Sequence, residues 1–200
     1  MKKPADTRFP LHDLISGRWS PRAFKDDPVS TEQLGSLFEA ARWGASCFNA
    51  QPWHFVVATK DDAEAYERIA SCLVEANAVW AKNAPVLGIA VAELAFQHNG
   101  KPNRWAQYDT GNAMANLSLQ AEAMGLVIHQ MGGFDAQKVH EVCGVPAEFD
   151  PIAAFAIGYA DAPESLGDEL ADRERAPRER KPLDSFVFGS KWGEKAGFVG

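Results

Sequence analysis

Apolar residues recur with a helical period in three stretches of the chain. In the first, Ser30-Thr31-Glu32-Gln33 has the pattern of a capping box, and the apolar positions after it lie three and four residues apart. This predicts an amphipathic helix over residues 31–43. A second helix is predicted from about Asp62 to Trp80, with one apolar side formed by Tyr66, Ile69, Leu73 and Trp80.

The third helical stretch runs from Asp109 to Met124, contains no proline, and is followed by Gly125, which is placed to end it. Small or apolar residues lie around most of its circumference, so we expect this helix to be buried on several sides. These residues are Gly111, Ala113, Ala115, Leu117, Leu119, Ala121 and Ala123.

Short apolar runs between these helices have the length and composition of buried strands. They are residues 55–58, 86–91, 126–130 and 152–159, and a short helix ending near Gly144 separates the last two. Runs of strand and helix mixed in this way predict an α+β fold, with helices around one small mixed or antiparallel sheet.

Composition narrows the class of protein. The chain has 200 residues, of which 46% are hydrophobic, and this suffices for one compact core. Its formal net charge of −7 argues against a general nucleic-acid binder. The sequence has no apolar run of the ~18 residues that cross a bilayer and no secretory leader, so we expect no membrane partner and a cytoplasmic protein.

The cysteines and histidines suggest neither a disulfide framework nor a metal site. Cys47, Cys72 and Cys143 are odd in number and lack C-x-x-C spacing, so we expect free thiols. The five histidines are scattered, with no H-E-x-x-H arrangement.

Two segments carry candidate chemistry. Arg18, Ser20 and Arg22 offer two guanidinium groups and a hydroxyl to an anion such as phosphate, although paired arginines are often only solvated surface cations. Asn49 and Gln51 lie on a loop that leads into the first strand. Their amides can hydrogen-bond a heteroaromatic ring, or they can cap their own turn.

The order of these motifs resembles the nitroreductase family of FMN-dependent NAD(P)H oxidoreductases, over nearly the whole chain. An Arg-x-Ser-x-Arg-x-Phe pattern over 18–24 precedes Asp27-Pro28-Val29-Ser30, and Ser46 precedes an Asn-x-Gln-Pro-Trp-x-Phe run over 49–55. Three further matches follow: Gly132-Gly133-Phe134-Asp135, Ile157-Gly158-Tyr159 and Arg178-Glu179-Arg180-Lys181-Pro182-Leu183.

The resemblance assigns the cofactor-binding residues. It implies that Arg18, Ser20, Arg178 and Arg180 bind the FMN phosphate or ribityl oxygens, and that Arg22 stabilises negative charge near flavin N1 and the C2 carbonyl. Ser46 and Asn49 would meet the ring and ribityl chain, while Gln51 would contact the ring or fasten the loop. Gly132 and Gly133 would bring backbone N–H groups close to N5, although many relatives carry an acidic residue at the first position. The resemblance implies neither a catalytic side chain nor a metal.

The resemblance also implies a homodimer. Residues 1–160 would form the FMN-binding core, and the charged extension 161–200 would cross to the partner, add a strand to its sheet and complete the phosphate site. The extension carries Phe186-Val187-Phe188 and Trp192, apolar groups that need a surface to cover.

The implied reaction is ping-pong transfer of hydride from NADH or NADPH, through flavin N5, to a small electron-poor acceptor such as a nitroaromatic, a quinone or an activated alkene. The chain has no G-x-G-x-x-G motif after a strand, which fits two substrates that take turns in one pocket. Residues 93–105 form either a loop that selects the acceptor or an ordinary surface excursion. Alternatives are a flavoenzyme of another reaction (dehydrogenation, dehalogenation or flavin breakdown) and a flavin-binding protein without turnover.

Overall fold

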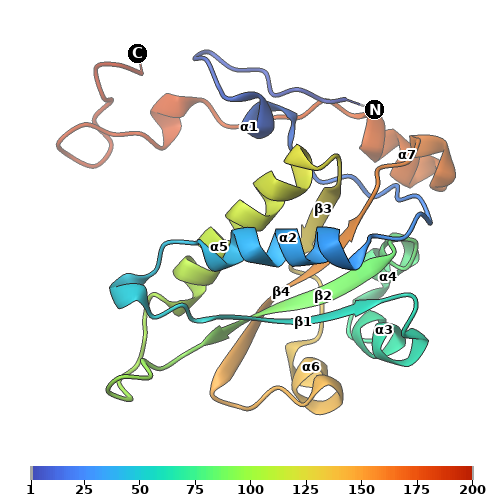
Figure 1. Ribbon diagram of the computed structural model, residues 1–200. Coiled ribbons are helices and arrows are strands. Elements are labelled where there is room, and N and C mark those ends of the chain that lie inside the picture. The colour runs from blue at the N-terminus through green and yellow to red at the C-terminus, as the bar shows by residue number, and fades with distance from the viewer. Residues whose placement is uncertain (1, 200) are drawn as a thin grey trace.

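A four-stranded antiparallel sheet lies at the centre of the computed structural model, which describes residues 2–199 (Figure 1). The strands are β1 (Trp53–Thr59), β2 (Val86–Glu93), β3 (Val127–Met131) and β4 (Phe149–Gly158). Their order across the sheet is β1-β2-β4-β3, so β2 and β4 are central and β1 and β3 are the edges. The strands predicted from apolar runs are therefore confirmed, and all their pairings are antiparallel.

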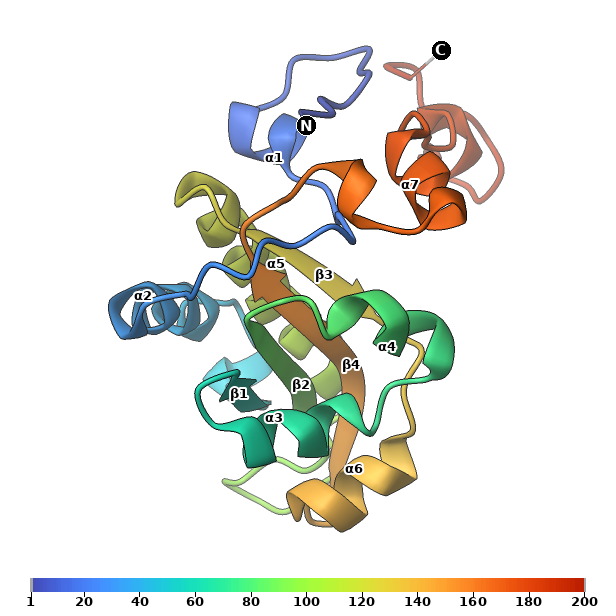
Figure 2. The same cartoon turned by 90° about the vertical axis from the view of Figure 1, so that its right-hand side faces the viewer.

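Helices cover both faces of the sheet (Figure 2), and alternate side chains of the central strands pack against the two helical layers. Leu87 and Ile89 of β2 pack under three helices: α3 (Ala63–Ala70), α4 (Glu75–Ala81) and α6 (Ala136–Cys143). Val86 and Ala90 face the other side, which is covered by α2 (Thr31–Arg42) and α5 (Ala106–Ala123). Strand periodicity thus gives the sheet two buried faces, and the predicted α+β architecture is confirmed.

The predicted helix over residues 31–43 is α2, and its capping box is present. The Ser30 hydroxyl accepts a hydrogen bond from the Gln33 N–H, and the Gln33 side chain accepts one from the Ser30 N–H. The helix predicted from Asp109 to Met124 is α5. Gly125 follows it with φ of 72°, the left-handed conformation that ends a helix at low cost for glycine.

The single helix predicted from about Asp62 to Trp80 is wrong, because the chain breaks between α3 and α4. At the break Leu73 forms a β-bridge with Phe134, the Val74 N–H donates to the Gly133 carbonyl (3.2 Å), and the Asp135 N–H donates to the Cys72 carbonyl (2.8 Å). Pairing with a distant segment replaces the local helical bonds. Both halves keep the apolar side that suggested one helix, with Ile69 and Trp80 in the same core.

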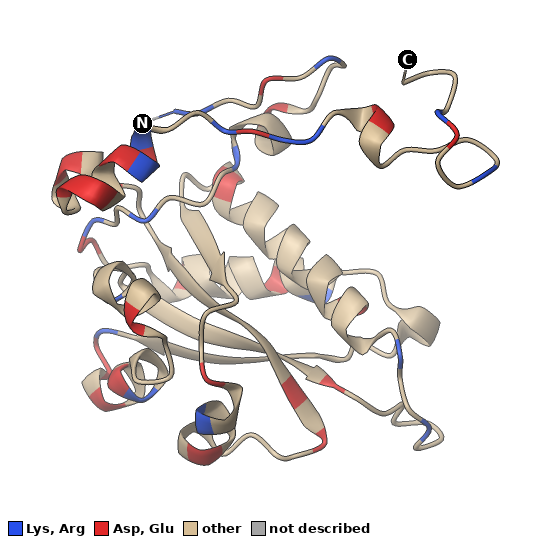
Figure 3. Cartoon of the chain, turned by 180° about the vertical axis from the view of Figure 1, so that it is seen from behind, with Lys and Arg blue, Asp and Glu red and all other residues tan. Residues whose placement is uncertain are grey.

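The two terminal segments lie side by side beyond one end of the sheet (Figures 1 and 2). They contain α1 (Asp13–Gly17) and α7 (Asp168–Arg175). The Arg178 guanidinium joins them by donating to the carbonyls of Lys3 (2.6 Å) and Ser16 (2.7 Å). Figure 3 shows many of the charged residues in α7 and the terminal segments, whereas the sheet and most of α5 carry few. Among residues 2–199, none of the helices combines the length and the apolar character that crossing a bilayer requires.

Candidate functional site

Three arginines from two distant segments line one large hollow. Arg18 follows α1, while Arg178 and Arg180 follow α7, and all three border a cavity of about 1350 Å³ between the N-terminal segment and the tail. Burial lowers the pKa of Arg18, and the positive charges of Arg178 and Arg180 lower it further, against the opposing effect of Glu122. Guanidinium groups held close enough to repel one another form a site that favours a multiply charged anion.

The Arg18 side chain also reaches the predicted phosphate-binding serine. Its Nη1 donates a long hydrogen bond of 3.4 Å to the Ser20 hydroxyl. Arg18 caps α1, where its N–H donates to the Leu14 carbonyl (3.1 Å). The short helix thus fixes where Arg18 enters the hollow. Arg18, Ser20, Arg178 and Arg180, which the family resemblance assigns to the FMN phosphate or ribityl oxygens, are gathered at the same end of the molecule.

The segment after Ser20 is clamped by side chains from two other elements. Glu174 of α7 accepts hydrogen bonds from the N–H groups of Arg22 (2.8 Å) and Ala23 (3.2 Å) through Oε1. On the other side, Nδ1 of His129 in β3 lies 2.9 Å from the Pro21 carbonyl oxygen. These bonds hold the backbone on both sides of Arg22, so the position from which the Arg22 side chain extends is fixed.

His129 holds the Pro21 carbonyl with a neutral imidazole ring. Its ring lies 4.5 Å from the Trp80 ring, centroid to centroid. Burial lowers its pKa to about 4, and the charges of Arg22 and Arg18 act in the same direction, whereas the bond to the Pro21 carbonyl opposes them. At neutral pH the neutral imidazole therefore donates Nδ1–H to Pro21.

We expect acid to weaken the fold through His129. In the unfolded chain a histidine titrates near 6.5, so between about pH 6.5 and 4 the unfolded state binds more protons than the native state, and the free energy of unfolding falls as the pH falls. The loss should reach about 2–3 kcal/mol by pH 4. Urea denaturation at pH 7 and pH 4.5 measures it.

The matched variant for this prediction is His129→Asn, which keeps a donor near Pro21 but does not titrate in this range. Its stability should fall less than that of the wild type over the same interval, because the carboxylates that also titrate are common to both proteins. Equal pH dependence in the two proteins would contradict the role of His129.

The loop that carries Ser46, Asn49 and Gln51 has an unusual backbone. Phe48, Asn49 and Gln51 have φ of 53°, 54° and 50°, in the left-handed region that Asn tolerates and Phe rarely adopts. The Gln51 N–H donates to the Ser46 hydroxyl (3.0 Å), and the Gln51 amide donates to the Asn49 carbonyl (3.2 Å). Both bonds fasten the loop, which is one of the two roles that the sequence left open for Gln51. Strain kept in this way is typical of functional segments.

This loop is tied to the N-terminal end of α5. The buried carboxylate of Asp109, 3% exposed, accepts a hydrogen bond from the Cys47 N–H (2.9 Å). The arginine hollow lies at the other end of the same helix, where Glu122 acts on Arg18. The separation of Asp109 and Glu122 along the helix is about 20 Å at 1.5 Å per residue. Figure 1 shows the loop and α1 at opposite ends of α5, so one chain does not bring the two groups of predicted residues together.

Gly132 and Gly133 follow edge strand β3. A Cβ on Gly133 would lie 2.6 Å from Nδ2 of Asn77 and 2.9 Å from Cγ2 of Val74. The close packing against α4 therefore leaves room only for glycine at this position. A Cβ on Gly132 would meet nothing within 4 Å, and this residue is exposed. The backbone at Gly132 is therefore open to approach from outside the chain.

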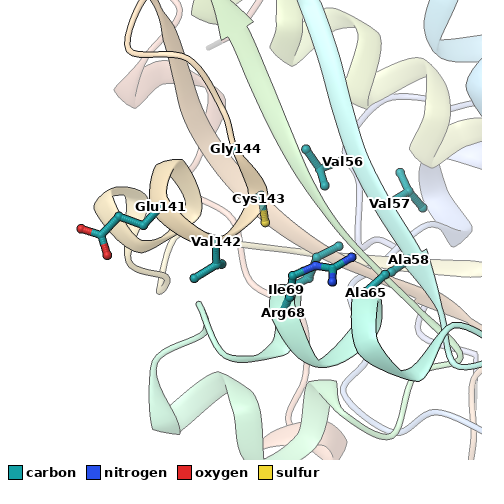
Figure 4. Close-up of a pocket in the computed structure, with 10 residues that line it drawn as sticks. All are labelled: Val56, Val57, Ala58, Ala65, Arg68, Ile69, Glu141, Val142, Cys143 and Gly144. Carbon is teal, nitrogen blue, oxygen red and sulfur yellow. The ribbon is translucent and has the colours of Figure 1, made fainter.

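A second hollow of about 470 Å³ lies between β1, α3 and α6 (Figure 4). Most of the residues that line it are apolar, Arg68 and Cys143 also border it, and the side chain of Glu141 points away from it (Figure 4). The predicted site residues lie elsewhere. Among residues 2–199 the His, Cys, Asp and Glu side chains form no group of three that could hold a metal ion.

Sequence reasoning missed three residues that shape the site. Glu174 lies in a charge run that has the pattern of a solvated face, yet it is 1% exposed. His129 has no motif around it. Asp109 did offer a signal, since it is a carboxylate within a helix that was expected to be buried on several sides, and such a group needs a specific partner.

Comparisons with known proteins identify the family and the fold of this chain. The model of the family described as "Nitroreductase family" matches residues 15–159. Protein DrgA of Synechocystis sp. is 34% identical over 180 residues, covering 76% of this chain and 85% of that protein. A protein of Xanthomonas oryzae pv. oryzae named "Putative NADH dehydrogenase/NAD(P)H nitroreductase" is 32% identical, with coverage of 76% and 85%. A crystal structure described as an oxidoreductase containing FMN has a TM-score of 0.89 and 35% identity, covering 95% of this chain and 96% of that one.

The chain therefore belongs to the nitroreductase family. The predicted nitroreductase-like fold is confirmed by the agreement with the FMN-containing oxidoreductase over nearly both full lengths. This membership makes the chain an oxidoreductase enzyme.

Proposed function

We propose that this chain is an FMN-dependent oxidoreductase that takes hydride from NADH or NADPH and passes it to a small electron-poor acceptor, such as a nitroaromatic or a quinone. The observation that carries the proposal is the convergence of Arg18, Arg178 and Arg180 on one hollow. In a protein of net charge −7, cations gathered in this way favour an anionic ligand, and a phosphate monoester fits their donors.

The chain has residues suited to the phosphate of FMN and to its ring. Arg18, Arg178 and Arg180 would bind the phosphate, and Ser20 would donate to a phosphate or ribityl oxygen. Arg22 would stand beside the N1 and C2 edge of the ring. The backbone N–H groups of Gly132, which is open, and of Gly133, which packs against α4, would approach N5. When bound, FMN supplies the atom that accepts and returns the hydride. The chain's own groups bind it, orient it and stabilise the negative charge that reduction brings.

Two observations support a homodimer whose site is shared between chains. The loop with Ser46, Asn49 and Gln51 is tied to the end of α5 opposite the arginine hollow, so it would reach the FMN of the partner chain. Large aromatic side chains are also exposed at both ends of the molecule: Trp43, Phe48 and Tyr108 at one end, and Phe186, Trp192 and Phe198 on the tail. We propose that the core 1–160 and the extension 161–200 bury these side chains between two chains, with the tail crossing to the partner.

The loop over residues 93–105 would select the acceptor. Phe96 lies 6.0 Å from the Phe48 ring and 5.3 Å from the His98 ring, centroid to centroid. This aromatic cluster adjoins Asn49 on the loop proposed to meet the flavin ring, and it suits a planar acceptor. Because the donor and the acceptor would occupy the same place in turn, the chain needs no separate nicotinamide domain.

Comparison of FMN with riboflavin tests the phosphate site. Riboflavin keeps the ring and ribityl chain but lacks the phosphate, so we expect the purified apoprotein to bind FMN at least ~100-fold more tightly, as three charge-assisted contacts require. Titration followed by quenching of flavin fluorescence measures both dissociation constants. Equal affinities would remove the arginines from the phosphate site, and absence of binding by either flavin would overturn the proposed function.

A further inference from the structure

Glu174 has a buried carboxylate, and one of its two oxygens accepts the hydrogen bonds of the clamp. Its side chain is 2% exposed, and Oε1 accepts both backbone N–H groups of the clamp, from Arg22 and Ala23. Its second oxygen, Oε2, is buried and accepts no hydrogen bond from the residues that the structure describes. This oxygen faces Nη1 of Arg22 at 3.9 Å.

A clamp on two backbone N–H groups does not require a charge. The oxygen of a glutamine amide also accepts such bonds, and a buried ionised carboxylate is costly unless a cation offsets it. The cation is Arg22, whose own side chain is 31% exposed and so extends from the buried carboxylate toward the surface. The arrangement therefore couples one buried negative charge to one positive charge that is free to meet a ligand.

We propose that Glu174 is a positioning residue for Arg22, which fixes the direction of the guanidinium and lowers the net positive charge that the flavin experiences. This inference rests on the proposed function, in which Arg22 lies beside the N1 and C2 edge of FMN. It assigns to α7, in the charged C-terminal extension, a part in setting the reduction potential as well as in holding the phosphate.

The sign of the effect follows from the charges. Reduction of FMN adds negative charge near N1, so the Arg22 cation favours the reduced flavin and a nearby carboxylate disfavours it. Removing the charge of Glu174 while keeping its shape should therefore make the flavin easier to reduce. If Glu174 acted only as a structural clamp, Glu174→Gln would leave the reduction potential of FMN unchanged, because the amide oxygen preserves both backbone hydrogen bonds.

The test is the midpoint potential of the FMN-loaded protein, measured by equilibration with a reference dye during slow enzymatic reduction. We expect Glu174→Gln to raise the potential, with the ratio of reduced to oxidised FMN at a fixed dye ratio increased by about tenfold. Glu169→Gln is the matched control: it lies on the same helix and removes the same charge, but Glu169 is exposed and pairs with Arg173. The control should leave the ratio within about twofold of wild type, as screened surface charges do.

A second pair of variants tests the same coupling from the side of Arg22. Arg22→Gln should lower the potential, and Arg22→Gln combined with Glu174→Gln should restore part of that loss, because the unopposed carboxylate is then gone. An unchanged potential in Glu174→Gln, or no restoration in the double variant, overturns the role of Glu174 while FMN binding stands. If the wild type binds no FMN, the proposed function and this inference fall together.

Discussion

Arg18→Ala is expected to weaken FMN binding by about 30-fold or more while leaving riboflavin binding unchanged. The substitution removes a charge-assisted contact to phosphate, and the loss of such a contact costs about 2–3 kcal/mol. Arg18 is the member of the cluster whose pKa is lowered by both of the others, so it lies where their fields overlap. Fluorescence titration of the apoprotein with each flavin measures the effect.

Arg173→Ala is the control for this variant. Arg173 carries the same charge and lies five residues before Arg178, but it is exposed and pairs with Glu169 on the surface of α7. FMN should bind this control as it binds the wild type. An equal loss of FMN and riboflavin affinity in Arg18→Ala would mean that Arg18 supports the fold of the site and does not contact the phosphate.

A heterodimer of two inactive variants is expected to bind one FMN and to show about half of the wild-type activity. One chain would carry Arg18→Ala and Arg180→Ala, and the other Ser46→Ala and Asn49→Gly. If each site takes its arginines from one chain and its loop from the other, the mixed dimer holds one intact site and one doubly damaged site. Glycine is chosen at position 49 because it keeps the left-handed conformation without strain.

The experiment uses two affinity tags, so that tandem purification isolates the mixed dimer. FMN content per dimer is read from absorbance, and turnover from oxidation of NADH with a quinone. Each variant alone should be empty and inactive. A mixed dimer that also binds no FMN would show that both groups serve the same chain, and would contradict the shared site.

Elements that depend on interactions between residues close in sequence were predictable, and features that depend on contacts between distant residues were not. Elements set by local periodicity and capping, such as α2 after Ser30 and α5 before Gly125, were found where they were predicted. The break between α3 and α4 was missed, because Leu73 pairs with Phe134 about 60 residues away and local apolar spacing carries no trace of that pairing.

The candidate site divides in the same way. Arg18 and Arg178 were grouped through the family resemblance, since no physical rule acting on the sequence alone brings residues so far apart together. Glu174 could not be found from its pattern, because i,i+4 charge runs on a short helix are usually solvated. Its burial follows from the packing of α7 against the segment at Arg22, a tertiary contact.

The proposed function requires that this chain use bound FMN to move hydride from a reduced nicotinamide to another molecule. The most direct measurement is the visible absorbance spectrum of the FMN-loaded protein under anaerobic conditions, before and after addition of NADH or NADPH, and again after addition of a quinone or a nitroaromatic. We predict that the flavin bands bleach with at least one nicotinamide and return with the acceptor. A flavin that stays oxidised with both nicotinamides would contradict the proposed function and leave a flavin-binding protein without this turnover.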